Sequence, residues 1–426
     1  MTRWWTLLIL GLALGSAAGA ELSGGPMLGL VDHQEARVWV RATGEGSARL
    51  ELRPSADAPW AVADEGRFDP ARDGTLILRA TGLQPRRTYG YRVVVDGAAT
   101  PAGELRTLPP PGTGSLKLAF GSCLHLGRYP DQPIFEAIAR AQPDVFVSLG
   151  DYVYYQGGDV RSQEGLYARM REQRESKDFA AFGKRVPCLA VWDDHDYGPN
   201  NADRTFPLRR QSREVWQSYW ANPSYGEDGE GVYGVVQLGP LDLFLLDDRS
   251  FRSPNLSPPG PEHRILGARQ VAWLEGALTR SRARLKLIAV GGQFLSRWPL
   301  PVETWEVAQE ERAQILELIR DKEVKGVVFL SGDVHMAEVL KARADVVGYP
   351  LYEVTSSPLA NHNNPGLESM PHAGRQFVHN SGNNYGWVEV DLEQNTLLLE
   401  IRDEQGQTLW SARPQDVLAP KPKRFY

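Results

Sequence analysis

The chain of 426 residues is 42% hydrophobic and 23% charged, which is ordinary for a soluble globular protein. Its formal net charge is −6 and no basic block stands out, which argues against a surface that wraps duplex nucleic acid. At roughly 100–200 residues per domain, we expect two or three domains.

Residues 1–20 have the pattern of a secretory signal peptide. Arg3 provides a positive charge, residues 4–14 form an apolar run, and Ala18-Gly19-Ala20 fits a small-residue cleavage site. The run is too short for a transmembrane helix, which needs about 20 apolar residues. We therefore expect a mature protein that is secreted or periplasmic and has no transmembrane anchor. An uncleaved anchor is the alternative.

Residues 21–108 are expected to form a small all-β module. Apolar and polar residues alternate in the segments 37–40, 48–52 and 89–95, and helix periodicity is absent. Such a series of short strands predicts a β-sandwich that resembles immunoglobulin or fibronectin type III modules. Residues 82–89 resemble a corner of the fibronectin type. Because the module carries no cluster of reactive residues, we expect it to serve packing or docking.

The pattern changes after residues 109–112, a Pro-Pro-Pro-Gly linker, because proline cannot join a central strand. Residues 116–426 then alternate between strand-like and helix-like patterns, which predicts an α/β domain. Helices are expected at residues 131–141, with Asp131 as the N-cap, and at 166–182, 208–221, 268–280 and 307–322. Strands 232–238 and 241–246 are expected to pair as a hairpin, and 386–392 and 396–402 as a final pair.

Four predicted strands, at 116–120, 145–149, 186–192 and 326–330, are each followed by residues of metal-ligating types. These residues are Cys123, then Asp151 and Tyr154, then Asp193, Asp194, His195 and Asp196, and finally Asp333 and His335. Ligands of open α/β sheets bind beyond the carboxyl ends of the strands. A group of carboxylates, imidazoles and a thiol is costly to desolvate without a cation. The sequence therefore predicts a site for two or more metal ions that is used for hydrolysis, with the polar residues 361–371 as a loop over it.

The chain has two cysteines, Cys123 and Cys188, and an oxidising compartment would favour a disulfide. However, Cys123 follows the end of its predicted strand and Cys188 lies near the start of another. On parallel neighbouring strands the two would be separated by roughly 16 Å, beyond the roughly 7 Å Cα limit of a disulfide. We interpret Cys188 as a core thiol and Cys123 as a candidate ligand.

Taken in order, the motifs resemble those of the PhoD-like alkaline phosphatase family of the calcineurin-like metallophosphoesterases. The matching segments are GSC, GDYVY, WDDHDYGPN, LLDDRSFR, SGDVH and EVTSSP, and the resemblance covers nearly all of the mature chain. It implies an α/β (α+β) fold, in which a metallophosphoesterase-type αββα sandwich, the catalytic domain at 116–426, follows the β-sandwich. As in that family, Cys123 stands where most metallophosphoesterases have an Asp/His pair, and Asp194 replaces an Asn.

The resemblance also implies a role for each site residue. Fe³⁺ would be held by Cys123, Asp151, Tyr154 and His335, and Asp151 would bridge to one or two Ca²⁺ ions bound also by Asp194 and Asp333. Gln293 would either bind Ca²⁺ as well or orient its ligands. His195 is the implied general acid. Three residues would join the calcium side or orient its ligands, namely Asp193, Asp196 and Asn200. Three others either contact the substrate phosphate or belong to surface loops, namely His125, Arg128 and Arg204. Asp247 and Arg249 are expected to form a salt bridge that fixes a strand end.

The expected function is that of a secreted, metal-dependent phosphoric ester hydrolase that uses metal-activated hydroxide on a small phosphate ester. The choice between phosphomonoesters and phosphodiesters stays open. One alternative is a phospholipase D-like phosphodiesterase that acts on phospholipid. The other is a catalytically inactive envelope protein that binds a partner through the β-rich module. The oligomeric state also stays open.

Overall fold

The computed structural model describes residues 19–227, 229–258, 260–297 and 304–420. The expected signal peptide therefore lies almost wholly outside the described residues. Among the described residues, no helix is both long enough and apolar enough to cross a membrane.

The first strands form two small sheets that share one core. One sheet has the order β1-β2-β5, and the other has the order β4-β3-β6-β7 with β8 paired to β6. The strands are β1 (Glu21–Val31), β2 (Glu35–Thr43), β3 (Ser47–Arg53), β4 (Ala61–Arg67), β5 (Thr75–Thr81), β6 (Thr88–Val95), β7 (Ala98–Ala99) and β8 (Gly103–Arg106). The backbone N–H of Gln84 donates to the Tyr89 hydroxyl at 2.9 Å, a tie that resembles the tyrosine corner of β-sandwiches.

Two larger sheets lie in the part of the chain that follows the N-terminal sheets. The six-stranded sheet has the order β11-β10-β9-β19-β20-β21. Its strands are β9 (Ser115–Gly121), β10 (Val145–Leu149), β11 (Cys188–Val191), β19 (Asn384–Asp391), β20 (Thr396–Asp403) and β21 (Thr408–Ala412). The seven-stranded sheet has the order β12-β13-β14-β15-β17-β16-β18. Its strands are β12 (Gly234–Leu238), β13 (Leu241–Leu245), β14 (Leu285–Ala289), β15 (Val327–Ser331), β16 (Ala337–Ala342), β17 (Leu351–Thr355) and β18 (Arg375–His379).

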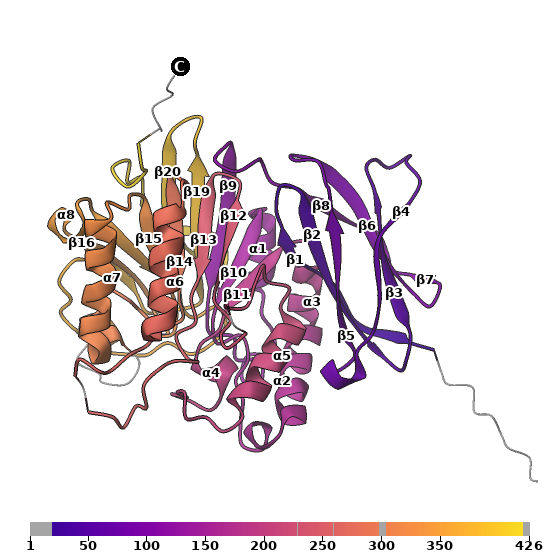
Figure 1. Cartoon of the computed structure of the whole chain (residues 1–426), viewed down its shortest axis with the longest axis horizontal. Helices are drawn as coiled ribbons and strands as arrows, with labels where there is room; N and C mark the ends of the chain where they lie inside the picture. The colour runs from indigo at the N-terminus through magenta and orange to yellow at the C-terminus, as the bar shows by residue number, and fades with distance from the viewer. Residues whose placement is uncertain (1–18, 228, 259, 298–303, 421–426) are drawn as a thin grey trace, which may run out of the picture.

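The two larger sheets pack face to face and carry helices on their outer faces (Figure 1). The shared core between them includes Leu118 and Val147 of the first sheet and Leu287 and Val328 of the second. The first sheet is covered by α1 (Ile134–Arg140), α2 (Gln163–Glu175), α3 (Lys177–Gly183) and α5 (Arg209–Tyr219). The second sheet is covered by α6 (Gly267–Arg280) and α7 (Gln309–Asp321). The described residues also include the short helices α4 (Asp194–Tyr197) and α8 (Ala344–Val347). The predicted αββα architecture is confirmed.

Two details of the helices differ from the sequence-based expectation. The helix predicted at 166–182 is interrupted at Ser176, whose ψ of 139° is not helical, so α2 and α3 are separate. Asp131 is not the N-cap of α1, because Pro133 occupies that position and the helix begins at Ile134. A proline fits a helix start because it has no N–H to leave unsatisfied there.

The N-terminal sheets pack directly against the helices of the first large sheet. Trp39 Nε1 on β2 donates to the carbonyl of Ser218 at 2.8 Å, and the Tyr91 hydroxyl donates to the carbonyl of Lys184 at 2.8 Å. Trp39 and Met27 belong to the same buried cluster as the side chains of α2, α3 and α5. The boundaries at 108 and 116 stay a prediction, but this contact gives both parts a common core.

Candidate metal centre

The parallel strands of both large sheets end at one edge of the molecule. Strands β9, β10 and β11 run parallel in the first sheet, and β14 and β15 run parallel in the second. The loops that leave these strands contact each other: Cys123 N donates to the carbonyl of Gly150, and Gly332 N donates to the carbonyl of Gly291 at 2.8 Å. The candidate ligands follow these strands and are therefore brought together, as ligand sites of α/β sheets require.

The backbone at several candidate ligands is left-handed. The φ angles are 65° at Cys123, 51° at Asp151, 69° at Asp333 and 54° at His335. Residues other than glycine rarely adopt this region, and such positions gather at functional sites. The adjacent Gly150 has a φ of 96°, and a Cβ there would lie 2.4 Å from the Cβ of Asp193. Sharp turns thus aim these side chains back across the strand ends.

One donor cluster contains Cys123, Asp151, Tyr154 and His335. The Tyr154 hydroxyl donates to Asp151 Oδ2 at 3.0 Å and lies 3.2 Å from His335 Nε2. Cys123 Sγ lies 3.5 Å from the same Asp151 oxygen. The ligand atoms of Cys123, Asp151 and His335 all lie within 4.8 Å of one another. A thiol, a phenol, an imidazole and a carboxylate that surround one point suit a transition metal.

Two further clusters adjoin the first. Asp151, Asp194 and His195 form one of them, and Asp193, Asp194 and Asp333 form the other, each with ligand atoms within 4.8 Å. Asp151 therefore belongs to two clusters, and so does Asp194. Shared carboxylates of this kind fit adjacent cations.

Arg249 provides the positive charge next to these carboxylates. Its buried guanidinium pairs with Asp193 and lies 3.8 Å from Asp248 and 4.0 Å from Asp194. Asp193 Oδ2, Asp194 Oδ1 and Asp248 Oδ1 are buried and have no hydrogen-bond partner among the described atoms. Buried carboxylate oxygens without a partner are costly, so the donor set fits bound cations.

The predicted salt bridge between Asp247 and Arg249 is wrong in its partner, because the Arg249 guanidinium pairs with Asp193 inside the centre. Asp247 has another role: it accepts hydrogen bonds from Trp192 Nε1 at 2.7 Å and from the Val232 N–H at 3.0 Å. Reasoning from sequence missed the role of Arg249, because nothing local shows which carboxylate it meets.

A model of a family described as PhoD-like phosphatase matches residues 118–410. The chain belongs to the PhoD-like phosphatase family. A model described only as a domain of unknown function matches residues 19–111 of this PhoD-like chain. The chain is 26% identical over 366 residues to alkaline phosphatase D of Bacillus subtilis (strain 168). That match covers 70% of the chain and 60% of the relative, so the chain spans about three fifths of the relative's length.

Solved structures show the same fold. A structure of PhoD superposes with a TM-score of 0.77 at 19% identity, covering 94% of this chain and 93% of that one. A purple acid phosphatase isolated from yellow lupin (Lupinus luteus) seeds superposes with a TM-score of 0.67 at 14% identity, covering 91% and 73%. The PhoD-like chain therefore has the metallophosphoesterase-type fold.

Two histidines pack against the Tyr154 ring in this PhoD-like centre. His125 stacks on it with ring centroids 4.6 Å apart, and His195 packs against it in a tilted arrangement with centroids 4.1 Å apart. Asn361 Nδ2 donates to the Tyr154 hydroxyl at 2.9 Å. Asn361 was not predicted as a site residue. Its one sequence signal was its place at the start of the irregular segment 361–371.

Two other predicted residues, Asp196 and Gln293, are buried and hydrogen-bonded to neighbouring groups. Asp196 accepts hydrogen bonds from the N–H groups of Tyr152, Val153 and Asp193, so it ties the β10 and β11 loops together, and burial raises its pKa to about 7. Gln293 Nε2 donates to Glu338 at 2.7 Å and to Thr355 at 3.0 Å.

Three of the predicted residues are exposed outside the clusters. They are Asn200, Arg128 and Arg204. The contact to Asp194 comes from the next residue, because the N–H of Asn201 donates to Asp194 Oδ2 at 2.5 Å. The chain turns at Asn201, where φ is 61°, and this turn points the backbone rather than the Asn200 side chain at the centre.

Burial and neighbouring carboxylates keep the thiol of Cys123 and the hydroxyl of Tyr154 protonated in the first cluster. Burial, together with the Asp151 and Asp333 carboxylates, holds the pKa of the Cys123 thiol well above its usual range. Burial and the neighbouring Asp151 likewise raise the pKa of Tyr154. Burial, with His362 beside it, lowers the pKa of His335 to about 4, so this imidazole is neutral. A cation bound here must displace protons from sulfur and oxygen, and none from His335.

We therefore expect the affinity for a divalent transition metal to rise with pH, by about tenfold per pH unit for each proton displaced. Chelator-treated protein would be titrated with Co²⁺ at about pH 6 and about pH 8, following thiolate-to-metal absorption. Cys123→Ser should bind weakly and lose that absorption, whereas Cys188→Ser, which changes a buried core thiol, should behave as the wild type. A dissociation constant that does not change with pH would contradict the raised pKa of Cys123.

Proposed function

We propose that this PhoD-like protein is a metal-dependent hydrolase of small phosphoric esters that acts outside the cytoplasm. The observation that carries the proposal is the row of three adjoining donor clusters, with Asp151 and Asp194 shared, at one sheet edge. Sulfur, phenol and imidazole donors support Fe³⁺ at Cys123, Asp151, Tyr154 and His335. The carboxylates of Asp193, Asp194 and Asp333 support Ca²⁺, which prefers oxygen ligands.

Bound cations would supply two things: neutralisation of the phosphate oxygens and a lowered pKa of water. The residues of the chain supply the geometry and the protons. Arg249 holds Asp193 in place through their ion pair, and Asn361 holds the hydroxyl of Tyr154 through a hydrogen bond. Asp196 fixes the loop that carries Asp151, through its hydrogen bonds to the next two N–H groups.

His195 is proposed as the general acid. Its Nε2 lies 3.9 Å from Asp194 Oδ2, and its side chain is 19% exposed, so an incoming ester can reach it. Packing against the Tyr154 ring limits the rotation of the imidazole. An imidazole held in this way can donate a proton to the oxygen that leaves phosphorus. His125, which also stacks on Tyr154, is proposed as a contact to the substrate phosphate, together with the exposed Arg128 and Arg204.

Initial rates with a chromogenic phosphate monoester and a chromogenic phosphate diester test the proposal. Purified mature protein would be assayed in calcium-containing buffer, before and after EDTA treatment and reloading with metal. We expect turnover that EDTA abolishes and metals restore, and the better substrate decides between monoesterase and diesterase. No turnover of either ester by protein shown to hold its metals would contradict the proposal and favour an inactive binding protein.

Export is proposed from the N-terminal pattern alone. N-terminal sequencing of protein recovered outside the cytoplasm should give a chain that begins at Glu21. An intact Met1 in the cell-associated fraction would contradict cleavage.

A further inference from the structure

Arg174, near the end of α2, is a buried cation outside the metal centre. It is 2% exposed. Its guanidinium carbon lies 4.5–5.6 Å from the centroids of five aromatic rings, namely Trp39, Tyr152, Phe179, Tyr219 and Trp220. Aromatic faces attract a guanidinium at such distances, most strongly when water is excluded.

The rings take the place of a counter-ion. Arg174 Nη1 donates to Met27 Sδ, and Nε and Nη2 have no hydrogen-bond partner among the described atoms. No carboxylate of the described residues pairs with this guanidinium. A buried charge without a counter-ion is costly, so attraction to the rings must offset part of that cost. The rings and the cation therefore hold one another in place.

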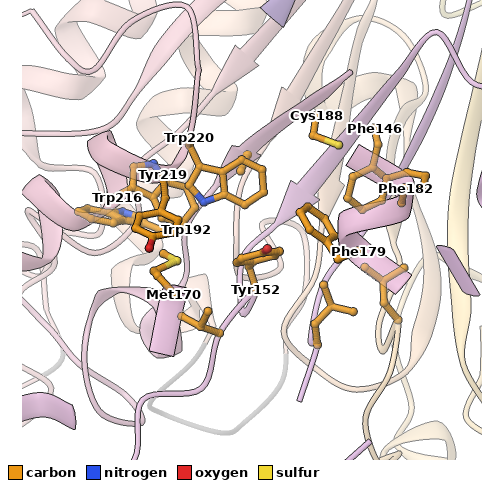
Figure 2. Close-up of a cluster of buried hydrophobic side chains, with 14 of the residues drawn as sticks. Phe146, Tyr152, Met170, Phe179, Phe182, Cys188, Trp192, Trp216, Tyr219 and Trp220 are labelled. Carbon is orange, nitrogen blue, oxygen red and sulfur yellow. The ribbon is translucent and has the colours of Figure 1, made fainter. Parts of the chain in front are cut away.

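The five rings and Met27 form a cage around Arg174, and this cage joins the N-terminal sheets to the large domain. Trp39 on β2 and Met27 on β1 form one side, and Trp39 is anchored by its hydrogen bond to the carbonyl of Ser218. The other side belongs to the large domain, and Figure 2 shows Tyr152, Phe179, Tyr219 and Trp220 in one buried cluster. Tyr152 makes edge-to-face contacts with Phe179 and Trp220, each with centroids 4.9 Å apart.

The same aromatic cluster borders both loops that carry shared metal ligands. Tyr152 directly follows Asp151, whose left-handed backbone must be held by its surroundings. On the other side, Trp220 packs against Trp216 at 5.4 Å, and Trp216 packs against Trp192 at 5.7 Å. Trp192 directly precedes Asp193. A shift of the cage would therefore act on Asp151 more directly than on Asp193, because Tyr152 belongs to the cage and Asp193 is connected to it only through Trp216 and Trp192.

We propose that Arg174 is a positioning residue of the metal centre and that the N-terminal sheets take part in this role, because Trp39 and Met27 complete the cage. The inference rests on the proposed function only in requiring that the centre binds cations. The N-terminal sheets are then a structural part of the centre, in addition to any docking role.

The test measures metal affinity at a temperature well below unfolding. Arg174→Met keeps much of the volume and removes the charge. We expect its dissociation constant for Co²⁺ to rise by about tenfold, as for other residues that orient ligands. Arg174→Lys, which keeps a cation among the rings, should stay within about threefold of the wild type. Leu50→Ala is the matched control, because Leu50 is fully buried in the separate core of the N-terminal sheets.

Leu50→Ala should lower the melting temperature and leave Co²⁺ affinity unchanged. Arg174→Met with wild-type affinity and a lower melting temperature would overturn the proposal, because its role would then be stability alone. If Arg174→Met does not fold, Trp39→Phe replaces it, with an expected loss of affinity of about threefold, and unchanged affinity would overturn the proposal equally. Failure of the wild-type protein to bind Co²⁺ would instead contradict the proposed function.

Discussion

Asp151→Asn is expected to reduce phosphate ester hydrolysis by on the order of 10³-fold. Asp151 belongs to two of the three donor clusters, so one substitution weakens two cation sites together. Asparagine keeps the shape of the side chain and tolerates the left-handed backbone that Asp151 adopts, with φ of 51°. The loss therefore comes from the missing negative charge and not from a misfolded loop.

The measurement is kcat together with metal content per protein chain. Asp242→Asn is the matched control, because Asp242 is also a buried carboxylate but lies near the start of β13 and accepts a hydrogen bond from Ser281 at 2.5 Å. That variant should keep its metals and its rate. Wild-type metal content and rate in Asp151→Asn would show that Asp151 is not a bridging ligand.

His195→Ala is expected to lower kcat by about 10²- to 10⁴-fold on esters whose leaving group is an alcohol. The reason is that an alkoxide is a poor leaving group unless it receives a proton. A nitrophenyl ester should lose much less, because nitrophenolate leaves without protonation. The measurement is the ratio of the two rates in wild type and variant.

His125→Ala serves as the comparison for this prediction. Both histidines pack against Tyr154, so both variants remove a ring from the same neighbour. Only His195→Ala should change the ratio between alkyl and nitrophenyl esters. An equal loss on both esters would instead identify His195 as a metal ligand, a role that its place beside Asp151 and Asp194 also allows.

Local sequence patterns predicted the gathering of the ligands because of a general property of parallel sheets. Strand 145–149 was predicted with the bounds that β10 has, and Asp151 is the second residue after its end. Cys123 and Asp333 stand in the same position after β9 and β15. Parallel strands end at a common edge, so residues that follow them meet there without knowledge of the tertiary contacts. The individual roles of these residues stay predictions.

The family and the αββα fold could also be inferred from sequence, because motif order and strand–helix alternation are local properties. The sequence did not predict the break at Ser176 or the start of α1 at Ile134, since capping and packing decide helix ends. It pointed to Asn200, whereas the turn at Asn201 brings a backbone N–H to Asp194. In this tight turn a shift of one residue decides whether a side chain or a backbone N–H faces the centre.

The sequence by itself therefore determined which residues leave the strand ends and, through the motifs, which family the chain belongs to. Only the tertiary structure decided which side chains, distant in the sequence, contact these residues. Arg249 reaches Asp193 from 56 positions away, Asn361 reaches Tyr154 from 207 positions away, and Trp39 meets Arg174 across the two parts of the chain. Such contacts leave no periodic signal in the sequence, because they arise when two sheets and their helices pack and direct each side chain.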